Sequence, residues 1–128
     1  MYTPTHEAIP GVMPNCPNRK ARLTYPTVNA KLRGTIQIKG SANIDNFQFY
    51  KVEYGEGDNP KAWHGISDVH RTPVVDGVLD VWNTDALPEG VYTLRLTVVD
   101  NTGNYPEPCD VRVVIEDFRS GTTPTPVS

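Results

Sequence analysis

Cysteine is scarce in this sequence, and metal-ligand spacings are absent. The 128 residues include two cysteines, Cys16 and Cys109, and neither has a second cysteine or a histidine pair close to it. Zinc sites place their ligands at short, regular spacings because four donors must reach one ion. We therefore predict no metal site, and no motif in the chain indicates a cofactor.

Strong positive charge and long apolar runs are also missing. The formal net charge is −3, and the basic residues form no run. The sequence therefore lacks the positive patch of nucleic-acid-binding proteins, and we expect no nucleic-acid partner. No apolar stretch approaches the roughly 18 residues of a membrane-spanning helix. No positively charged start leads into an apolar segment either, so we expect no signal peptide in this chain.

Proline is abundant, and it gathers at the two ends. Proline removes a backbone donor and fixes φ, so such segments are neither central strands nor helices. We expect a Pro-rich linker at 1–18, a folded domain at 19–117 and a Thr/Pro-rich linker at 118–128. This organisation predicts a piece of a longer protein, monomeric in isolation. A small natural protein with frayed ends is the alternative.

Apolar residues alternate with polar ones along most of the middle of the chain, and turn residues recur every 8 to 12 positions. The expected strands are 20–25, 32–42, 46–55, 61–66, 77–83, 90–100 and 109–116. Seven short antiparallel strands predict an all-β fold, an immunoglobulin-like antiparallel β-sandwich. A small barrel is the alternative.

Two of these strands have an ambiguous inward face. Either both of their faces are apolar, or a bulge switches the buried side. The competing sets are Phe47 and Phe49 against Tyr50, Val52 and Tyr54 in one strand, and Leu79 and Val81 against Val78 and Trp82 in the other.

Several motifs are more specific than this alternation. They are a first strand ending in Tyr25-Pro26, GTIQIKG at 34–40, FQFYKVEYG at 47–55, and LPEGVYTLRL at 87–96. Over residues 20–116 the chain resembles a family of bacterial extracytoplasmic immunoglobulin-like or fibronectin-III-like modules. Such modules are appended to secreted or membrane-anchored proteins, including penicillin-binding and transglycosylase enzymes of the cell wall and subtilisin-like proteases. Because they serve many hosts, the resemblance implies a fold more than a function.

The resemblance also bears on the two cysteines. First and last strands lie near each other in many such sandwiches, and an exported protein would meet an oxidising environment. A disulfide between Cys16 and Cys109 and an extracytoplasmic location are therefore implied. Two free thiols in a cytoplasmic protein are the alternative.

Catalytic motifs are weak. His64 and His70 flank Ser67 and Asp68, but no Gly-x-Ser-x-Gly elbow or glycine-rich oxyanion segment accompanies them. We predict no catalytic residue and no enzymatic activity, and we expect surface or loop positions for these histidines and for His6.

Acidic residues cluster twice without an implied cleft. We expect Asp76, Asp80 and Asp85 to be solvated or in turns, since a glycosidase pair must face across a cleft. Asp100 opens the stretch DNTGNYPEPCDV, which has turn residues but no EF-hand pattern, so we interpret it as a turn.

Two aromatic residues, Trp63 and Tyr105, are candidates for an exposed ligand platform, because a flat ring can stack on a sugar. Trp82 is expected to be structural. We predict a non-catalytic accessory or spacer module of a secreted or cell-surface bacterial protein, which positions a neighbouring domain at the envelope. The alternative is a carbohydrate- or peptidoglycan-binding module. The expected partners are neighbouring domains of the parent protein, cell-wall glycan or another surface protein.

Overall fold

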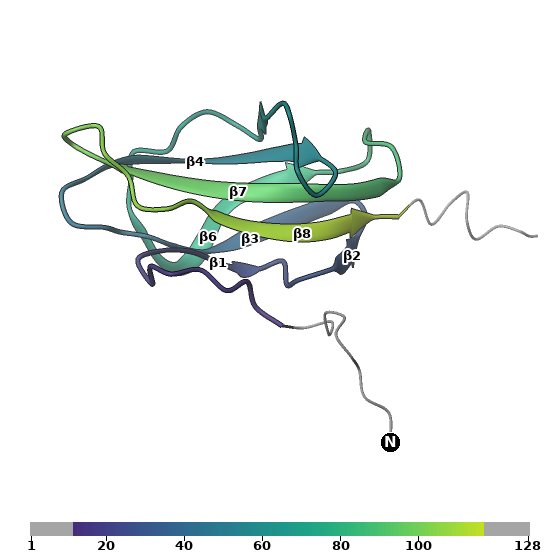
Figure 1. The fold of residues 1–128 in the computed structure, drawn as a ribbon, viewed down its shortest axis with the longest axis horizontal. Helices are drawn as coiled ribbons and strands as arrows, with labels where there is room; N and C mark the ends of the chain where they lie inside the picture. The colour runs from purple at the N-terminus through teal and green to yellow at the C-terminus, as the bar shows by residue number, and fades with distance from the viewer. Residues whose placement is uncertain (1–11, 117–128) are drawn as a thin grey trace, which may run out of the picture.

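Eight strands form in residues 12–116, the part of the chain that the computed structural model describes. They are β1 Ala21–Tyr25, β2 Ala30–Leu32, β3 Thr35–Ala42, β4 Phe47–Glu56, β5 His64–Gly65, β6 Val74–Asn83, β7 Gly90–Asp100 and β8 Cys109–Ile115. One sheet has the order β1-β3-β6 and the other β2-β8-β7-β4-β5 (Figure 1). The predicted all-β sandwich is confirmed.

The expected terminal linkers fall largely outside the described residues. Only 12–18 of the N-terminal linker is described, and His6 and the whole of 118–128 are not. Within residues 12–116, no helix has the length and apolarity that a membrane span requires.

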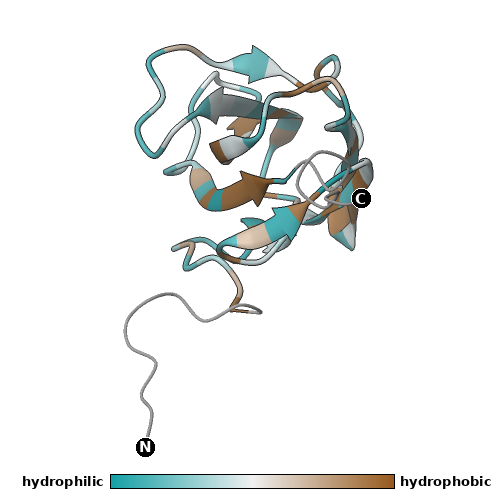
Figure 2. Cartoon of the chain, turned by 90° about the vertical axis from the view of Figure 1, so that its right-hand side faces the viewer, coloured by the Kyte–Doolittle hydropathy of each residue, from teal (hydrophilic) through white to brown (hydrophobic). Residues whose placement is uncertain are grey.

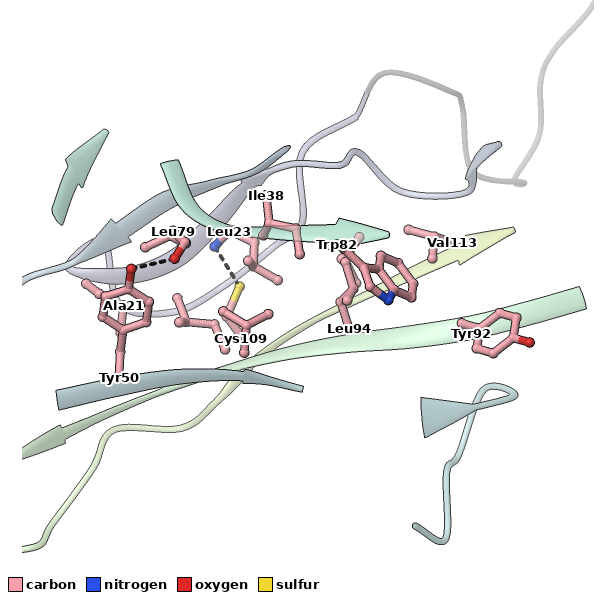
Figure 3. Close-up of a cluster of buried hydrophobic side chains, with 14 of the residues drawn as sticks. Ala21, Leu23, Ile38, Tyr50, Leu79, Trp82, Tyr92, Leu94, Cys109 and Val113 are labelled. Atoms are coloured by element: carbon pink, nitrogen blue, oxygen red, sulfur yellow. Dashed lines mark hydrogen bonds between the residues drawn. The ribbon is translucent and has the colours of Figure 1, made fainter. Parts of the chain in front are cut away.

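The core lies between the two sheets, where the inward residues of both sheets meet (Figure 3). The expected alternation in β7 is confirmed, because its inward residues are all buried: Tyr92, Leu94, Leu96 and Val98. Seen from one end, the hydrophobic colours concentrate on the strands and most connecting loops are hydrophilic (Figure 2). Burial of these apolar side chains is the main force holding the sheets together.

The predicted strand 32–42 is two strands in two sheets. Gly34 has a φ of +88°, a conformation that glycine adopts at little cost, and it separates β2 from β3. Before this point β2 runs parallel to β8, and after it β3 pairs antiparallel with β1 and β6. The segment 32–42, which has one continuous alternating pattern, therefore contributes strands to both sheets.

Bulges resolve the two ambiguous strands. In β4 the register shifts between Phe47 and Phe49, after which Tyr50 and Val52 point into the core. In the β3–β6 pairing the register shifts so that Leu79 becomes an extra residue. Leu79 and Trp82 are both buried, although they have opposite parity, because the bulge switches the facing side.

The expected disulfide between Cys16 and Cys109 is present, with 5.3 Å between the two Cα atoms. It ties the coil before β1 to the first residue of β8. The backbone N–H of Leu23 in β1 lies 3.1 Å from the buried sulfur of Cys109 (Figure 3). The bridge thus closes one side of the sandwich, where β1 of one sheet lies against β8 of the other.

Candidate functional site

A polar cluster closes the opposite side of the sandwich, between β4 and β6. Ser67 and His70 come from the segment after β5, and Asp80 comes from β6. The Ser67 hydroxyl lies 2.9 Å from Oδ2 of Asp80 and 3.1 Å from Nε2 of His70. The same Nε2 lies 2.9 Å from Oδ2 of Asp80. Three groups that can exchange protons therefore meet at one point.

Tyr50 of β4 covers this cluster from the core side. Its ring stacks on that of His70, with 4.7 Å between the centroids. Its hydroxyl donates a 2.5 Å hydrogen bond to the carbonyl of Leu79 (Figure 3). Burial, and secondarily the negative charge of Asp80, raise the pKa of Tyr50 to about 12.

The geometry of the cluster differs from a catalytic relay. In a Ser-His-Asp triad the serine and the carboxylate contact opposite ring nitrogens, so that the imidazole can pass a proton between them. Here both Ser67 and Asp80 contact Nε2 of His70. The cluster is better suited to joining the two sheets than to activating a nucleophile.

One expectation from the sequence is wrong at this cluster. Asp80, expected in solvent or in a turn, is buried with 8% of its surface exposed. It lies on a strand that faces the other sheet, where Ser67 and His70 satisfy its carboxylate. Asp68, the sequence neighbour, is exposed, and His64 lies apart, against the ring of Tyr54 at 5.3 Å between centroids.

The aromatic candidates lie on or near the outer face of the five-stranded sheet. The guanidinium carbon of Arg95 lies 4.3 Å from the ring centroid of Trp63, a cation–π contact. Arg95 also makes two hydrogen bonds to Asp110, of 2.9 and 3.0 Å, which raise the pKa of its guanidinium. Tyr105 in the β7–β8 loop is 56% exposed. Trp63 is therefore half-buried and braced, whereas Tyr105 is exposed.

Two hollows open at the end of the sandwich where β4 ends. The first, here called the loop hollow, has a volume of about 400 Å³ and is lined by Glu56, Asn59, Lys61, Ala62 and His64. The second, here called the turn hollow, has a volume of about 280 Å³ and is lined by Glu56, Pro88, Glu89, Gly90, Val91 and Tyr92. Glu56 lines both.

The stretch from Asp100 to Val111 contains a tight turn. One carboxylate oxygen of Asp100 accepts hydrogen bonds from the N–H and hydroxyl of Thr102 and from the N–H of Asn104. These bonds lower the pKa of Asp100. The local pattern of an aspartate bonded to the following N–H groups supports the turn interpretation. In residues 12–116, no three potential metal ligands gather at one point.

Sequence reasoning missed the partners that tertiary structure supplies. Arg95 of β7 contacts Trp63 because the loop before β5 lies over the sheet, and nothing in the local sequence marks that pair. Asp80 is likewise 13 positions from Ser67. The loop hollow had a faint signal, the polar run EGDNPK directly after a strand.

Compared with protein-family models, curated protein sequences and solved structures, the chain matches none of them.

Proposed function

We propose that this chain is a non-catalytic, immunoglobulin-like accessory module of a secreted or cell-surface bacterial protein, where it positions a neighbouring domain at the envelope. The Cys16–Cys109 disulfide carries this proposal. Disulfides of this kind persist in oxidising compartments and are rare in the cytosol. Here the bridge fixes the N-terminal coil on the folded body.

The strand arrangement supports the immunoglobulin-like part of the proposal. The sheets β1-β3-β6 and β8-β7-β4 correspond to strands A, B, E and G, F, C of such sandwiches. The hydroxyl of Tyr92, near the start of β7, donates a 2.7 Å hydrogen bond to the carbonyl of Pro88. This bond is similar to the tyrosine corner of immunoglobulin-like domains, and it supports the proposal.

The contacts of the buried polar cluster and the packing between the sheets support a non-catalytic role. The one serine–histidine–aspartate cluster among the described residues joins the two sheets through a shared Nε2 atom. The space between the sheets is filled by buried hydrophobic side chains. Both features favour a rigid body that holds other domains apart.

The location is tested in the cells that make the protein. An antibody against this domain should label intact cells or the culture medium, and a thiol-blocking reagent added before lysis should leave Cys16 and Cys109 unmodified. Deleting the domain should reduce the action of the neighbouring domain on the cell wall without changing its turnover of a soluble substrate. A purely cytoplasmic protein with both thiols blocked would contradict the proposal.

A second candidate function is carbohydrate or peptidoglycan binding on the outer face of the five-stranded sheet. The favouring observation is that Arg95, held by Asp110, braces the ring of Trp63 at 4.3 Å. A ring held in place loses less entropy when a sugar stacks on it. The exposed Tyr105 would add a second platform.

Tryptophan fluorescence tests this candidate. Trp82 is buried in the core, so a change on adding peptidoglycan fragments or polysaccharides should come from Trp63. A Trp63→Leu variant should lose the change. An unaltered spectrum with every glycan would remove this candidate and leave the accessory-module proposal intact.

A further inference from the structure

The loop hollow and the turn hollow adjoin at Glu56, the last residue of β4. Glu56 lines both, and their volumes of about 400 and 280 Å³ lie near the range of small-ligand sites. Two neighbouring hollows that share one side chain suit a ligand with two repeating units.

Five of the polar side chains that line the hollows have no hydrogen-bond or salt-bridge partner within the described residues, whereas the Tyr92 hydroxyl is bonded to Pro88. Elsewhere on this protein, charged side chains pair readily, as Arg95 does with Asp110 and Arg112 with Asp58. In residues 12–116, no hydrogen bond or salt bridge engages the side chains of Glu56, Asn59, Lys61, His64 and Glu89. Their donors and acceptors therefore remain available to a ligand.

Asn59 and Lys61 lie in the loop between β4 and β5, which hydrogen bonds and an ion pair hold against β7 and β8. The N–H of Gly57 bonds to the carbonyl of Val91 at 2.8 Å, and the Gly57 carbonyl accepts a 2.7 Å bond from Thr93. Asp58 pairs with Arg112 at 2.6 Å. An anchored loop presents its polar groups at a low entropic cost on binding.

Close packing between the β4–β5 loop and the end of β4 also holds the loop in place. Gly55 has no side chain, and a Cβ atom there would collide with the ring of Pro60. The absence of a side chain at Gly55 therefore lets the loop fold over the end of β4. The ring of His64, which lines the loop hollow, also packs against that of Tyr54, with 5.3 Å between the centroids.

We infer that the two hollows form adjoining subsites for a neutral oligosaccharide. Hydroxyl groups both donate and accept hydrogen bonds, and the lining offers acceptors at Glu56 and Glu89 and a donor at Lys61. Charges of both signs, Glu56 and Lys61, line the loop hollow, and the carboxylates of Glu56 and Glu89 line the turn hollow, where they can accept hydrogen bonds from sugar hydroxyls. The inference goes beyond the carbohydrate-binding candidate, because it places the sugar at the Glu56 end and not on the Trp63 face.

The test is an NMR titration of the full chain, following backbone amides and the two indole N–H signals. Cellotetraose, chitotetraose and maltotetraose are added in turn at millimolar concentration. Saturable shifts with one of them should centre on 56–64 and 89–91. Glu56→Gln should weaken binding by about tenfold, because a charged carboxylate acceptor shared by both hollows is replaced by a weaker neutral amide. Lys61→Met should weaken binding as well.

Glu107→Gln is the matched control, since it neutralises an exposed carboxylate in the β7–β8 loop and should leave the affinity unchanged. Shifts centred on the Trp63 indole and Tyr105 that Glu56→Gln does not weaken would overturn the inference and favour the outer-face platform. The absence of shifts with all three oligosaccharides would overturn both sugar sites. Neither result would affect the accessory-module proposal, which is tested by cellular location.

Discussion

The hydroxyl of Tyr50 donates a 2.5 Å hydrogen bond to the carbonyl of Leu79, and this bond links the two sheets across the β4–β6 side of the sandwich. On the β1–β8 side, the Cys16–Cys109 disulfide has the corresponding role. One side is therefore closed by a covalent bond and the other by a polar network. The two closures can be tested separately.

Removing the disulfide should destabilise the domain strongly. The bridge closes a loop with a sequence separation of 93, and such a bridge contributes about 2 to 4 kcal/mol, largely by restricting the unfolded chain. We expect Cys16→Ala to lower the free energy of unfolding by that amount in urea titrations. Reductant should destabilise the wild type but have little further effect on the variant. Equal stability of the wild type with and without reductant would contradict this role.

The Tyr50→Phe substitution should remove a specific pH dependence. The pKa of Tyr50 is about 12 in the folded protein against an ordinary value of 10.0, so the folded state holds this proton more tightly. The resulting stabilisation is complete below pH 10 and is lost as the pH rises from about 10 to 12. The variant should lose less stability than the wild type over this interval, measured by urea unfolding. Parallel pH profiles for the two proteins would show that Tyr50 is not responsible.

Tyr92→Phe should cost about 1 kcal/mol of unfolding free energy, because the 2.7 Å hydrogen bond to Pro88 is lost while the ring stays buried. Tyr54→Phe is the matched control, since the Tyr54 hydroxyl has no hydrogen-bond partner in residues 12–116. Thermal unfolding should separate the two variants. A similar loss in both would mean that the Pro88 bond contributes nothing specific.

Asp80→Ala should destabilise the protein by roughly 1 to 3 kcal/mol, because it removes a buried carboxylate and leaves Ser67 and His70 without that partner. Asp68→Ala, at an exposed position beside them, should stay within about 0.5 kcal/mol of the wild type. Chemical denaturation of the two variants makes the comparison. The prediction is wrong if they unfold at the same denaturant concentration.

Gly40→Ala should disrupt the β1–β3 pairing. A Cβ atom at Gly40 would collide with the backbone carbonyl of Arg22, whereas a Cβ at Gly65 meets its nearest atom, the carbonyl oxygen of Ser67, at 3.3 Å. Overpacking of this kind costs about 1 to 3 kcal/mol, and occasionally more. Thermal unfolding of Gly40→Ala and the control Gly65→Ala should differ accordingly. A fully stable Gly40→Ala would show that β1 can move away without cost.

Much of the fold is encoded by local pattern. Alternation in 90–100 and 109–116 predicts which side chains point inward, because one face of each strand must leave water. In β6 apolar residues occur on both faces of the strand. There, only the register with β3 decides that Leu79 and Trp82 are both buried. A bulge depends on the partner strand, so one strand read alone does not reveal it.

By itself, the sequence determined the all-β class, most strand positions and the choice of Cys16 and Cys109 as partners. The class and the strand positions follow from the alternation of apolar and polar residues and from the turn residues. The choice of the cysteines follows from the family resemblance. Only the tertiary structure placed Asp80 beside His70, Arg95 on Trp63, and Glu56 between two hollows. Such contacts join residues that are distant in the chain. They arise from how the sheets stack and where loops fold back, which local propensity does not specify.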